Sequence, residues 1–178
     1  MARESTRKLC LTAMGIALFV VLSLCLQVPI FENYYVCLGY VIMMLFCYFC
    51  GPLSGMTVGT VGVVVYCLII GGLNGLPGWA IGNLFIGFFV GMVCRLTQGV
   101  SSRIVRHIII GISIVVATAI AMLGFKSLVE TILYAQPMWL RAMKNVYAFV
   151  ADAATMIASI PICIGLEPII KKRLKSHN

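Results

Sequence analysis

Long runs of apolar residues recur along the chain, and their length limits what it can fold into. The first extends from Leu9 to Val28, and similar runs follow as far as residue 169. A run of about 18 or more apolar residues is long enough to cross a membrane as a helix. The chain is 62% hydrophobic and 10% charged, whereas a soluble domain has about 25% charged residues. The sequence therefore predicts an integral membrane protein.

The apolar runs predict an all-α fold of six membrane-spanning helices in one domain, residues 1–178. The first run is too long for a secretory signal and lacks a convincing cleavage site, so it is expected to be the first span. The second run is short and is separated from the third by the turn sequence GPLSG at 51–55. The expected spans are about 9–28, about 37–50, from the GPLSG turn to about 70, about 79–95, about 105–125 and about 143–169.

The 13 Lys and Arg residues set the expected orientation. Six spans place both termini on one side, and ten of the 13 lie in the N-terminal segment, the 95–106 loop and the C-terminal tail. Cytoplasmic loops are enriched in Lys and Arg, so the termini are predicted to be cytoplasmic. This clustering, rather than nucleic-acid binding, accounts for the net charge of +8. The expected external segments are 29–36, 71–78 and 126–142, with the cations Lys126, Arg141 and Lys144.

The connection before the fourth span is rich in turn residues and amides. The sequence GGLNGLPGWAIGN, residues 71–83, has five glycines, one proline, one tryptophan and the amides Asn74 and Asn83. Glycine lets a ligand or a neighbouring backbone come close. Trp79 and Asn83 are four residues apart and share one helix face, which suits a flat polar small molecule. The alternative is an interfacial tryptophan anchor and an amide that joins two helices.

Asp152 is the only acidic residue deep inside a predicted span. A carboxylate in a membrane helix is costly, faces the bundle interior and by default indicates function. Asn145, Phe149 and Asp152 occur at i, i+4 and i+7, so they share one face at the outer depth of Asn83. A structural bond from Asp152 to Lys144 or to a tyrosine hydroxyl is the alternative.

These faces predict one outward-facing binding site. Two tyrosines in the second and third spans lie at a similar depth. The candidate substrate-binding residues are Tyr40, Tyr66, Asn74, Trp79, Asn83, Asn145, Phe149 and Asp152.

Signals for catalysis and metal binding are poor. The eight cysteines include one CxxC pair, Cys47 and Cys50, which lies in an apolar run without a nearby histidine. Scattered cysteines in apolar helices behave as small hydrophobic residues. His107 lies beside basic residues and far along the chain from Asp152. No nucleotide-binding glycine motif or HExxH is present, so we expect no enzyme activity, no metal site and no cofactor.

Small residues also recur at the four-residue spacing that lets helix backbones approach closely. Gly55 and Gly59 form one such pair and Gly87 and Gly91 another. We expect both pairs to pack helices within the bundle.

With these features, the chain resembles the substrate-binding S components of energy-coupling factor (ECF) vitamin transporters, over nearly all of its 178 residues. The resemblance is to the riboflavin-type branch. The segments that carry it are LTAMGIALFVVLS, LGYVIMMLFCYFCGPLSGMTVGTVG and GLPGWAIGNLFIGFFVG.

The resemblance implies a multi-pass subunit in the plasma membrane of a prokaryote that binds one water-soluble vitamin or precursor with high affinity. Riboflavin, a pyridoxine-type compound and pantothenate are among the candidates. It also implies association with a membrane scaffold (T) subunit and two cytoplasmic ATPase subunits, and a toppling motion that releases the cargo inward. Ala13 and Ala17 match the family's scaffold-docking motif, and Gly15 between them is expected to widen the groove.

Two other functions are compatible with the sequence. A ligand-free membrane assembly protein would explain the glycines as packing residues, but not Asp152 and the amides at matching depth. A standalone secondary transporter is expected to contain inverted repeats, and no convincing repeat of three plus three spans is visible.

Overall fold

The structure is a computed structural model that describes residues 2–25, 27–31 and 34–175. Apart from one short hairpin, the described chain is helical. In chain order the elements are α1 (Ala2–Cys25), β1 (Gln27–Phe31), β2 (Tyr34–Cys37), α2 (Gly39–Phe49), α3 (Pro52–Ile70), α4 (Leu76–Leu96), the 3-10 turn η1 (Thr97–Gly99), α5 (Arg103–Ala119), the π-helical segment η2 (Ile120–Lys126), α6 (Ser127–Tyr134), α7 (Met138–Ala158) and α8 (Ile160–Lys175).

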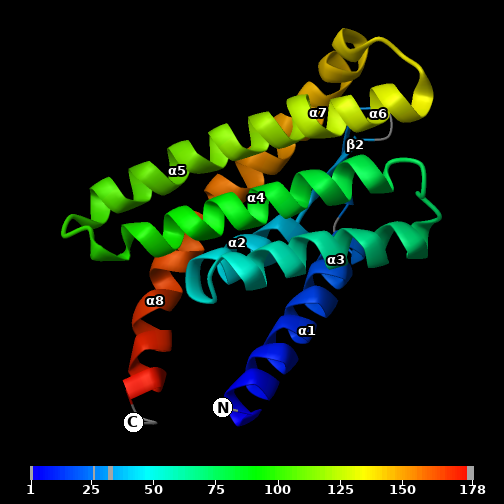
Figure 1. The fold of residues 1–178 in the computed structure, drawn as a ribbon. Coiled ribbons are helices and arrows are strands. Elements are labelled where there is room, and N and C mark those ends of the chain that lie inside the picture. Colours follow the sequence, from blue (N-terminus) through cyan, green and yellow to red (C-terminus); the bar gives the residue numbers. More distant parts are fainter. Residues whose placement is uncertain (1, 26, 32–33, 176–178) are drawn as a thin grey trace.

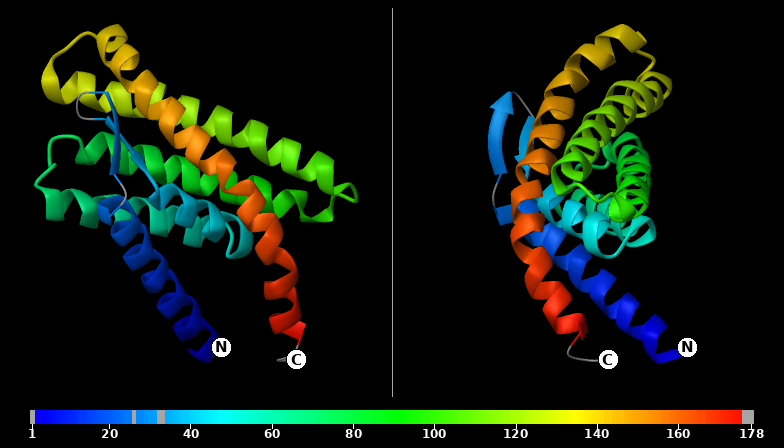
Figure 2. Two further views of the ribbon diagram at one scale, coloured as in Figure 1. Left: turned by 180° about the vertical axis from the view of Figure 1, so that it is seen from behind. Right: turned by 90° about the vertical axis from the view of Figure 1, so that its left-hand side faces the viewer.

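The helices form a bundle with two projecting arms. α4 lies between α3 and α5, and α7 crosses the bundle and contacts α2, α5 and η2 (Figures 1 and 2). The first and last helices, α1 and α8, lead away from the bundle, so both chain ends lie at the lower edge of Figure 1. The α3–α4 and α6–α7 connections lie at the end of the bundle opposite the α4–α5 connection.

In the described part of the chain, five helical stretches are long and apolar enough to cross a membrane: Thr6–Cys25, Pro52–Ile70, Leu76–Gly99, Arg103–Tyr134 and Met138–Ile170. The second predicted span corresponds to α2, which has only 11 residues. At 1.5 Å per residue such a helix covers about 17 Å, roughly half of the hydrocarbon core. The turn at Gly51, whose φ of 89° suits glycine, and Pro52 separate it from α3.

The polar break after the first span is an antiparallel hairpin, which the all-helical expectation did not include. β1 pairs with β2, with Val28 opposite Val36, so Val28 belongs to a strand rather than to the first span. Aromatic and β-branched residues are frequent on both sides of the break, and they favour strands. The tip, residues 32–33, lies outside the described part of the chain.

The fifth predicted span continues beyond its expected end. α5, η2 and α6 form one helical stretch, Arg103–Tyr134, so the expectation that residues 126–134 form a loop was wrong. The wide π turn is supported by the Ser127 hydroxyl, which donates to the Met122 carbonyl 3.1 Å away. Only residues 135–137 connect to α7, which starts directly after Pro137, a residue suited to a helix start.

The predicted glycine packing is confirmed. A Cβ on Gly87 would lie 2.6 Å from the Met56 Cα, and one on Gly91 would lie 2.5 Å from the Pro52 Cα, so α3 and α4 touch through their backbones. Gly15 likewise packs against Phe46. It therefore faces the bundle and does not widen the outward surface of α1, contrary to our expectation.

Candidate functional site

A cavity of about 490 Å³ lies where the α3–α4 connection, the start of α4, η2, α6, α7 and β2 meet. Small-molecule sites in proteins have volumes of about 300–1,000 Å³. The cavity is lined by Ser23, Val36, Cys37, Tyr66, Cys67, Ile70, Gly71, Gly72, Asn74, Gly75, Trp79, Lys126, Glu130, Tyr134, Arg141, Ala148 and Asp152.

A chain of hydrogen bonds fixes one wall of the cavity. The Trp79 indole donates to the Tyr40 hydroxyl at 2.8 Å, and that hydroxyl donates to Asn83 Oδ1 at 2.7 Å. Asn83 in turn donates to the Gly59 carbonyl on α3 at 3.3 Å. Tyr40 and Asn83 are fully buried, and neither lines the cavity. They hold Trp79 in place from behind, while Tyr66 packs edge-on against its ring.

Asp152 reaches the cavity from α7. It is 5% exposed. Two structural partners were considered for it, a tyrosine hydroxyl and Lys144: the Tyr40 hydroxyl donates to Asn83, and Lys144 is exposed. Cys37 on β2 lies on the same wall, 3.0 Å from the Ser23 hydroxyl.

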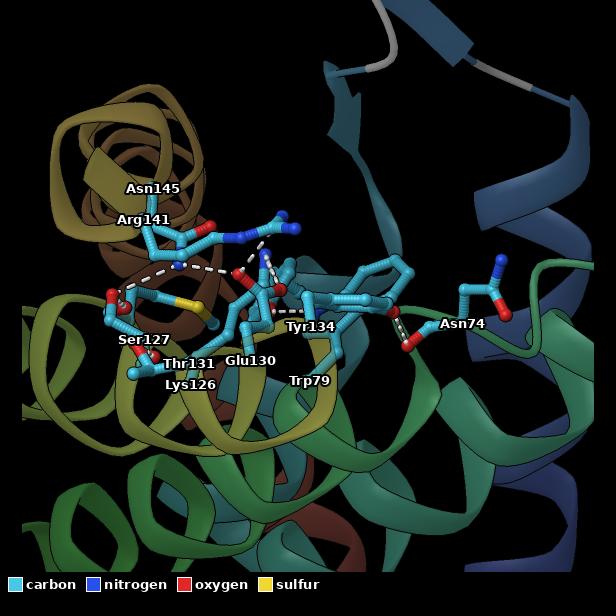
Figure 3. A network of polar contacts seen from close by, with 11 residues as sticks. Asn74, Trp79, Lys126, Ser127, Glu130, Thr131, Tyr134, Arg141 and Asn145 are labelled. Atoms are coloured by element: carbon cyan, nitrogen blue, oxygen red, sulfur yellow. Dashed lines mark hydrogen bonds and ion pairs between the residues drawn. The ribbon is translucent and has the colours of Figure 1, made fainter. Parts of the chain in front are cut away.

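Three charged residues form a further wall (Figure 3). Glu130 Oε1 lies 4.0 Å from Lys126 Nζ, and Glu130 Oε2 lies 4.0 Å from a terminal nitrogen of Arg141. Asn145 donates to Glu130 Oε2 at 3.0 Å and to the Ser127 hydroxyl at 3.0 Å. One carboxylate thus lies between two cations, held by a buried amide.

The α3–α4 connection is tied to α6 beside these charges. The Tyr134 hydroxyl donates to the backbone carbonyl of Asn74. The Arg141 guanidinium lies 4.4 Å from the centre of the Tyr134 ring, a distance at which a cation is attracted to the ring face. Tyr134 therefore positions both Arg141 and the glycine-rich connection (Figure 3).

The structure divides the eight residues predicted from sequence into two sets. Tyr66, Asn74, Trp79 and Asp152 line the cavity. Tyr40 and Asn83 support Trp79, Asn145 supports Glu130, and Phe149 packs against the hydrophobic core.

The sequence reasoning did not select Glu130 or Tyr134, and it treated Lys126 and Arg141 only as rim cations. Lys126, Glu130 and Tyr134 follow one another at a spacing of four residues, which places them on one face of a helix. This spacing is the sequence signal that can identify them, but only if residues 126–134 are helical, whereas a loop is expected there from the sequence.

A second polar cluster joins α2, α5 and α8 away from the cavity. The Tyr48 hydroxyl donates to Glu167 at 3.1 Å, and it lies 3.2 Å from a His107 ring nitrogen. Arg106 pairs with Glu167 at 3.5 Å. α2 therefore carries Tyr40 towards the cavity and Tyr48 towards this second cluster. Within the described residues, no three His, Cys, Asp or Glu side chains form a group that could hold a metal ion.

Comparison with known proteins identifies the family. The profile of the ECF-type riboflavin transporter S component family matches residues 3–167. The chain belongs to this family. It is therefore a membrane transport component that binds a substrate.

Similar proteins include two from Lactococcus lactis. The UPF0397 protein of subspecies cremoris strain NZ9000 and the UPF0397 protein YdcD of subspecies lactis strain IL1403 are each 28% identical over 176 residues, covering 93% of this chain and 92% of the relative.

The S-component fold is shared with a solved structure. The crystal structure of the S component for biotin from an ECF-type ABC transporter superposes with a TM-score of 0.67 at 16% identity, covering 94% of each chain. At this identity the likeness concerns the fold.

Proposed function

We propose that this S component captures a water-soluble vitamin or vitamin precursor on the outer face of a prokaryotic plasma membrane, for import by an ECF-type complex. The observation that carries the proposal is the cavity itself. It combines an aromatic wall with two basic and two acidic side chains at one end of an apolar bundle. Charged groups inside a membrane domain are costly, and substrate sites are the common reason for them. Riboflavin, a pyridoxine-type compound and pantothenate are the starting candidates.

The proposed orientation places both termini in the cytoplasm and the cavity towards the outside. Ten of the 13 Lys and Arg residues then lie on the cytoplasmic side, as the positive-inside rule expects. In this arrangement α2 is the sixth membrane-embedded helix. Because α2 is too short to cross the membrane alone, the β1–β2 hairpin that precedes it connects it to the outer surface. The five longer stretches supply the other crossings.

The ligand is proposed to lie against Trp79, with its polar edge towards Lys126, Glu130 and Arg141. Trp79 is held by the Tyr40 hydroxyl, so the wall is formed before the ligand binds. A pre-formed site loses less conformational entropy on binding. Asp152 is proposed to accept a hydrogen bond from the ligand.

The subunit is proposed to need a scaffold subunit and two ATPase subunits for transport. The chain has no ATP-binding motif of its own, and members of its family work in such complexes. Ala13 and Ala17 are exposed on the projecting helix α1. We propose them as the surface on which the scaffold helix docks.

The test is to purify the chain in detergent, extract it and identify any bound small molecule by mass spectrometry. Isothermal titration of the ligand-free protein against a panel of water-soluble vitamins follows. We expect one vitamin or precursor to bind with high affinity and Trp79→Ala to weaken it by at least tenfold. Trp139→Ala, which changes an exposed tryptophan outside the cavity, is the matched control. A protein that stays folded yet binds nothing in the panel contradicts the proposal.

A further inference from the structure

We propose that a second, apolar groove, between β2, the start of α2 and the α7–α8 face, holds one acyl chain of an outer-leaflet phospholipid, with the lipid phosphate on Lys144. The groove is separate from the vitamin cavity, so the proposal goes beyond the proposed function and does not depend on which vitamin binds. It uses the proposed orientation, in which α7 starts at the outer side of the membrane.

The groove has a volume of about 530 Å³, within the range of small-molecule sites. Small side chains of α7 form its floor: Ala151, Ala154 and Ala158. Larger apolar side chains flank them, among them Val41 of α2 and Ile162 of α8. The floor follows α7 for several turns, so the groove has the elongated form that suits a hydrocarbon chain.

The chemistry of the lining favours hydrocarbon. None of the residues that line the groove is charged. Two of them carry hydroxyls, and both hydroxyls are already used: Thr155 donates to the Ala151 carbonyl at 2.7 Å, and Ser159 donates to the Met156 carbonyl at 2.6 Å. A chain in the groove makes dispersion contacts on several sides, whereas a chain on a convex helix surface makes them on one side.

A cation lies in line with the groove at its outer end. Lys144, Ala151 and Ala158 are seven residues apart, which is close to two helical turns, so they share one face of α7. Lys144 is exposed. Side chains tilt towards the start of their helix, here the outer side, so the Lys144 ammonium can reach the headgroup region. A phosphate there is the complementary charge, and its acyl chain points into the groove.

The depth of the groove selects the outer leaflet. From Lys144 to Ala154 the helix rises about 15 Å, half of the hydrocarbon core of about 30 Å, and the oblique course of α7 makes the depth smaller (Figure 2). On the cytoplasmic side, the exposed Lys172 lies ten residues beyond Ile162. A chain from the inner leaflet would therefore reach only the lower end of the groove.

The lipid would support a wall of the vitamin cavity. Val36 on β2 lines both the groove and the cavity. β2 pairs with β1 in a two-stranded sheet and packs against α7 (Figure 2). A hairpin of two strands is marginally stable by itself, so its order depends on what packs against it. An acyl chain in the groove completes the packing around β2.

The experiment compares wild type with Ala154→Trp, which fills the groove, and Lys144→Gln, which removes the charge. Ile112→Trp and Lys8→Gln are the matched controls, because they make the same kinds of change at exposed positions on α5 and α1, outside the groove. Each protein is delipidated in detergent and titrated with phosphatidylglycerol or with diacylglycerol of the same chains. Native mass spectrometry measures bound lipid, and thermal unfolding confirms that each protein is folded.

We expect wild type and both controls to bind one phosphatidylglycerol more tightly than any further copy. Ala154→Trp should weaken this first site at least tenfold for both lipids. Lys144→Gln should weaken phosphatidylglycerol several-fold, as for a solvent-accessible ion pair, and leave diacylglycerol unchanged.

Hydrogen exchange gives a second measurement. Phosphatidylglycerol should slow exchange of the β2 amides in wild type and in Ile112→Trp, but not in Ala154→Trp. If Ala154→Trp does not fold, Lys144→Gln and the exchange of wild type decide.

Several results would overturn the proposal. Equal phosphatidylglycerol binding in Ala154→Trp and Ile112→Trp would place the lipid elsewhere, and equal binding in Lys144→Gln and wild type would reject the phosphate assignment. If wild type is a dimer by light scattering and Ala154→Trp a monomer, a second copy occupies the groove. If Ala154→Trp keeps its lipid but no longer co-purifies with the scaffold, a scaffold helix occupies it. None of these results bears on vitamin binding by the cavity.

Discussion

The Tyr40 hydroxyl on α2 links two residues of α4. It accepts from Trp79 and donates to Asn83, one turn further along that helix. Tyr40 and Asn83 are fully buried, and both hydrogen bonds lie in or behind the cavity wall. A single hydroxyl on α2 therefore supports the aromatic wall.

Tyr40→Phe should lower both stability and affinity. It removes only the hydroxyl, and an unsatisfied buried polar group costs about 1–3 kcal/mol. We expect a lower unfolding temperature and at least tenfold weaker ligand binding, measured by thermal unfolding and titration. Trp139→Phe, at an exposed position, should change neither. Unchanged affinity in Tyr40→Phe would show that Trp79 does not need this support.

Asp152→Asn tests the carboxylate directly. If Asp152 accepts a hydrogen bond from an uncharged ligand, the variant should weaken that ligand by roughly ten- to a hundred-fold, because a bond to a charged acceptor contributes about 1.5–3 kcal/mol. The same change should strengthen binding of an anion such as pantothenate. Lys144→Ala, at an exposed position, is the control. Equal affinities in wild type and Asp152→Asn would place the ligand away from α7.

At the scale of elements, the π-helical segment is what brings α6 into the site. η2 widens the helix and ends at Lys126, and Glu130 follows one turn later on α6; both residues line the cavity. π segments interrupt α-helices at functional sites more often than elsewhere. α7 then supplies Arg141 and Asp152 from the facing side. The helical stretch formed by η2 and α6 and the facing helix α7 therefore create the charged wall together.

The close contact of α3 with α4 predicts that alanine substitutions at Gly91 and Gly165 have different effects on stability. Gly91→Ala should destabilise the protein by about 1–3 kcal/mol, because the added methyl group meets the α3 backbone, which cannot move aside easily. Gly165→Ala should be neutral or stabilising, since no atom lies within 4 Å of the new Cβ and alanine favours helix. Thermal unfolding in one detergent compares them. Equal stability would contradict the close packing.

The exposed face of α1 with Ala13 and Ala17 is the proposed docking surface for the scaffold subunit. Ala13→Leu with Ala17→Leu should leave a folded protein that still binds its ligand, because both positions are exposed. Added bulk on a surface that requires close helix approach should prevent co-purification with the scaffold subunit. Gly15 faces Phe46 instead, so Gly15→Leu should damage folding. If the double variant keeps its scaffold, α1 docks through another face.

For the whole molecule, the proposed division of labour predicts binding without transport. Cells that produce this chain but lack the scaffold and ATPase subunits should bind labelled vitamin and show negligible uptake. Adding the three partner subunits should restore uptake. The measurement is accumulation of the label inside cells or proteoliposomes. Robust uptake by the chain alone would reject the proposal and support a standalone secondary transporter.

The second polar cluster gives the molecule two buried polar regions. Tyr48, His107 and Glu167 connect α2, α5 and α8. These helices are also connected to the cavity. α2 carries Tyr40, α5 continues into η2 and α6, and α8 follows α7. The last helix, α8, is tied to the bundle here through Glu167, after the break at Ser159.

The sequence by itself determined the membrane class, the family and the approximate positions of five helical stretches long and apolar enough to cross a membrane. These depend on run length and composition, which are properties of consecutive residues and of a bilayer of fixed thickness. Trp79 and Asp152 could also be chosen from the sequence as candidate binding residues. An aromatic residue at the end of a span and an acidic residue within a span are unusual enough to be noticed without knowing their neighbours in space. The cytoplasmic position of the termini stays a prediction from charge counts.

Only the tertiary structure decided which residues share the cavity. Glu130 meets Arg141 because a helical stretch continues through a π turn and α7 folds back on it after three residues, and no periodicity within one segment encodes that crossing. The same holds for Asn83 and Asn145. Both were predicted to bind the substrate, but their packing against α3 and α6 places them behind the cavity wall. Helix faces are set by local spacing, whereas what a face meets depends on the relative placement of helices far apart in the chain.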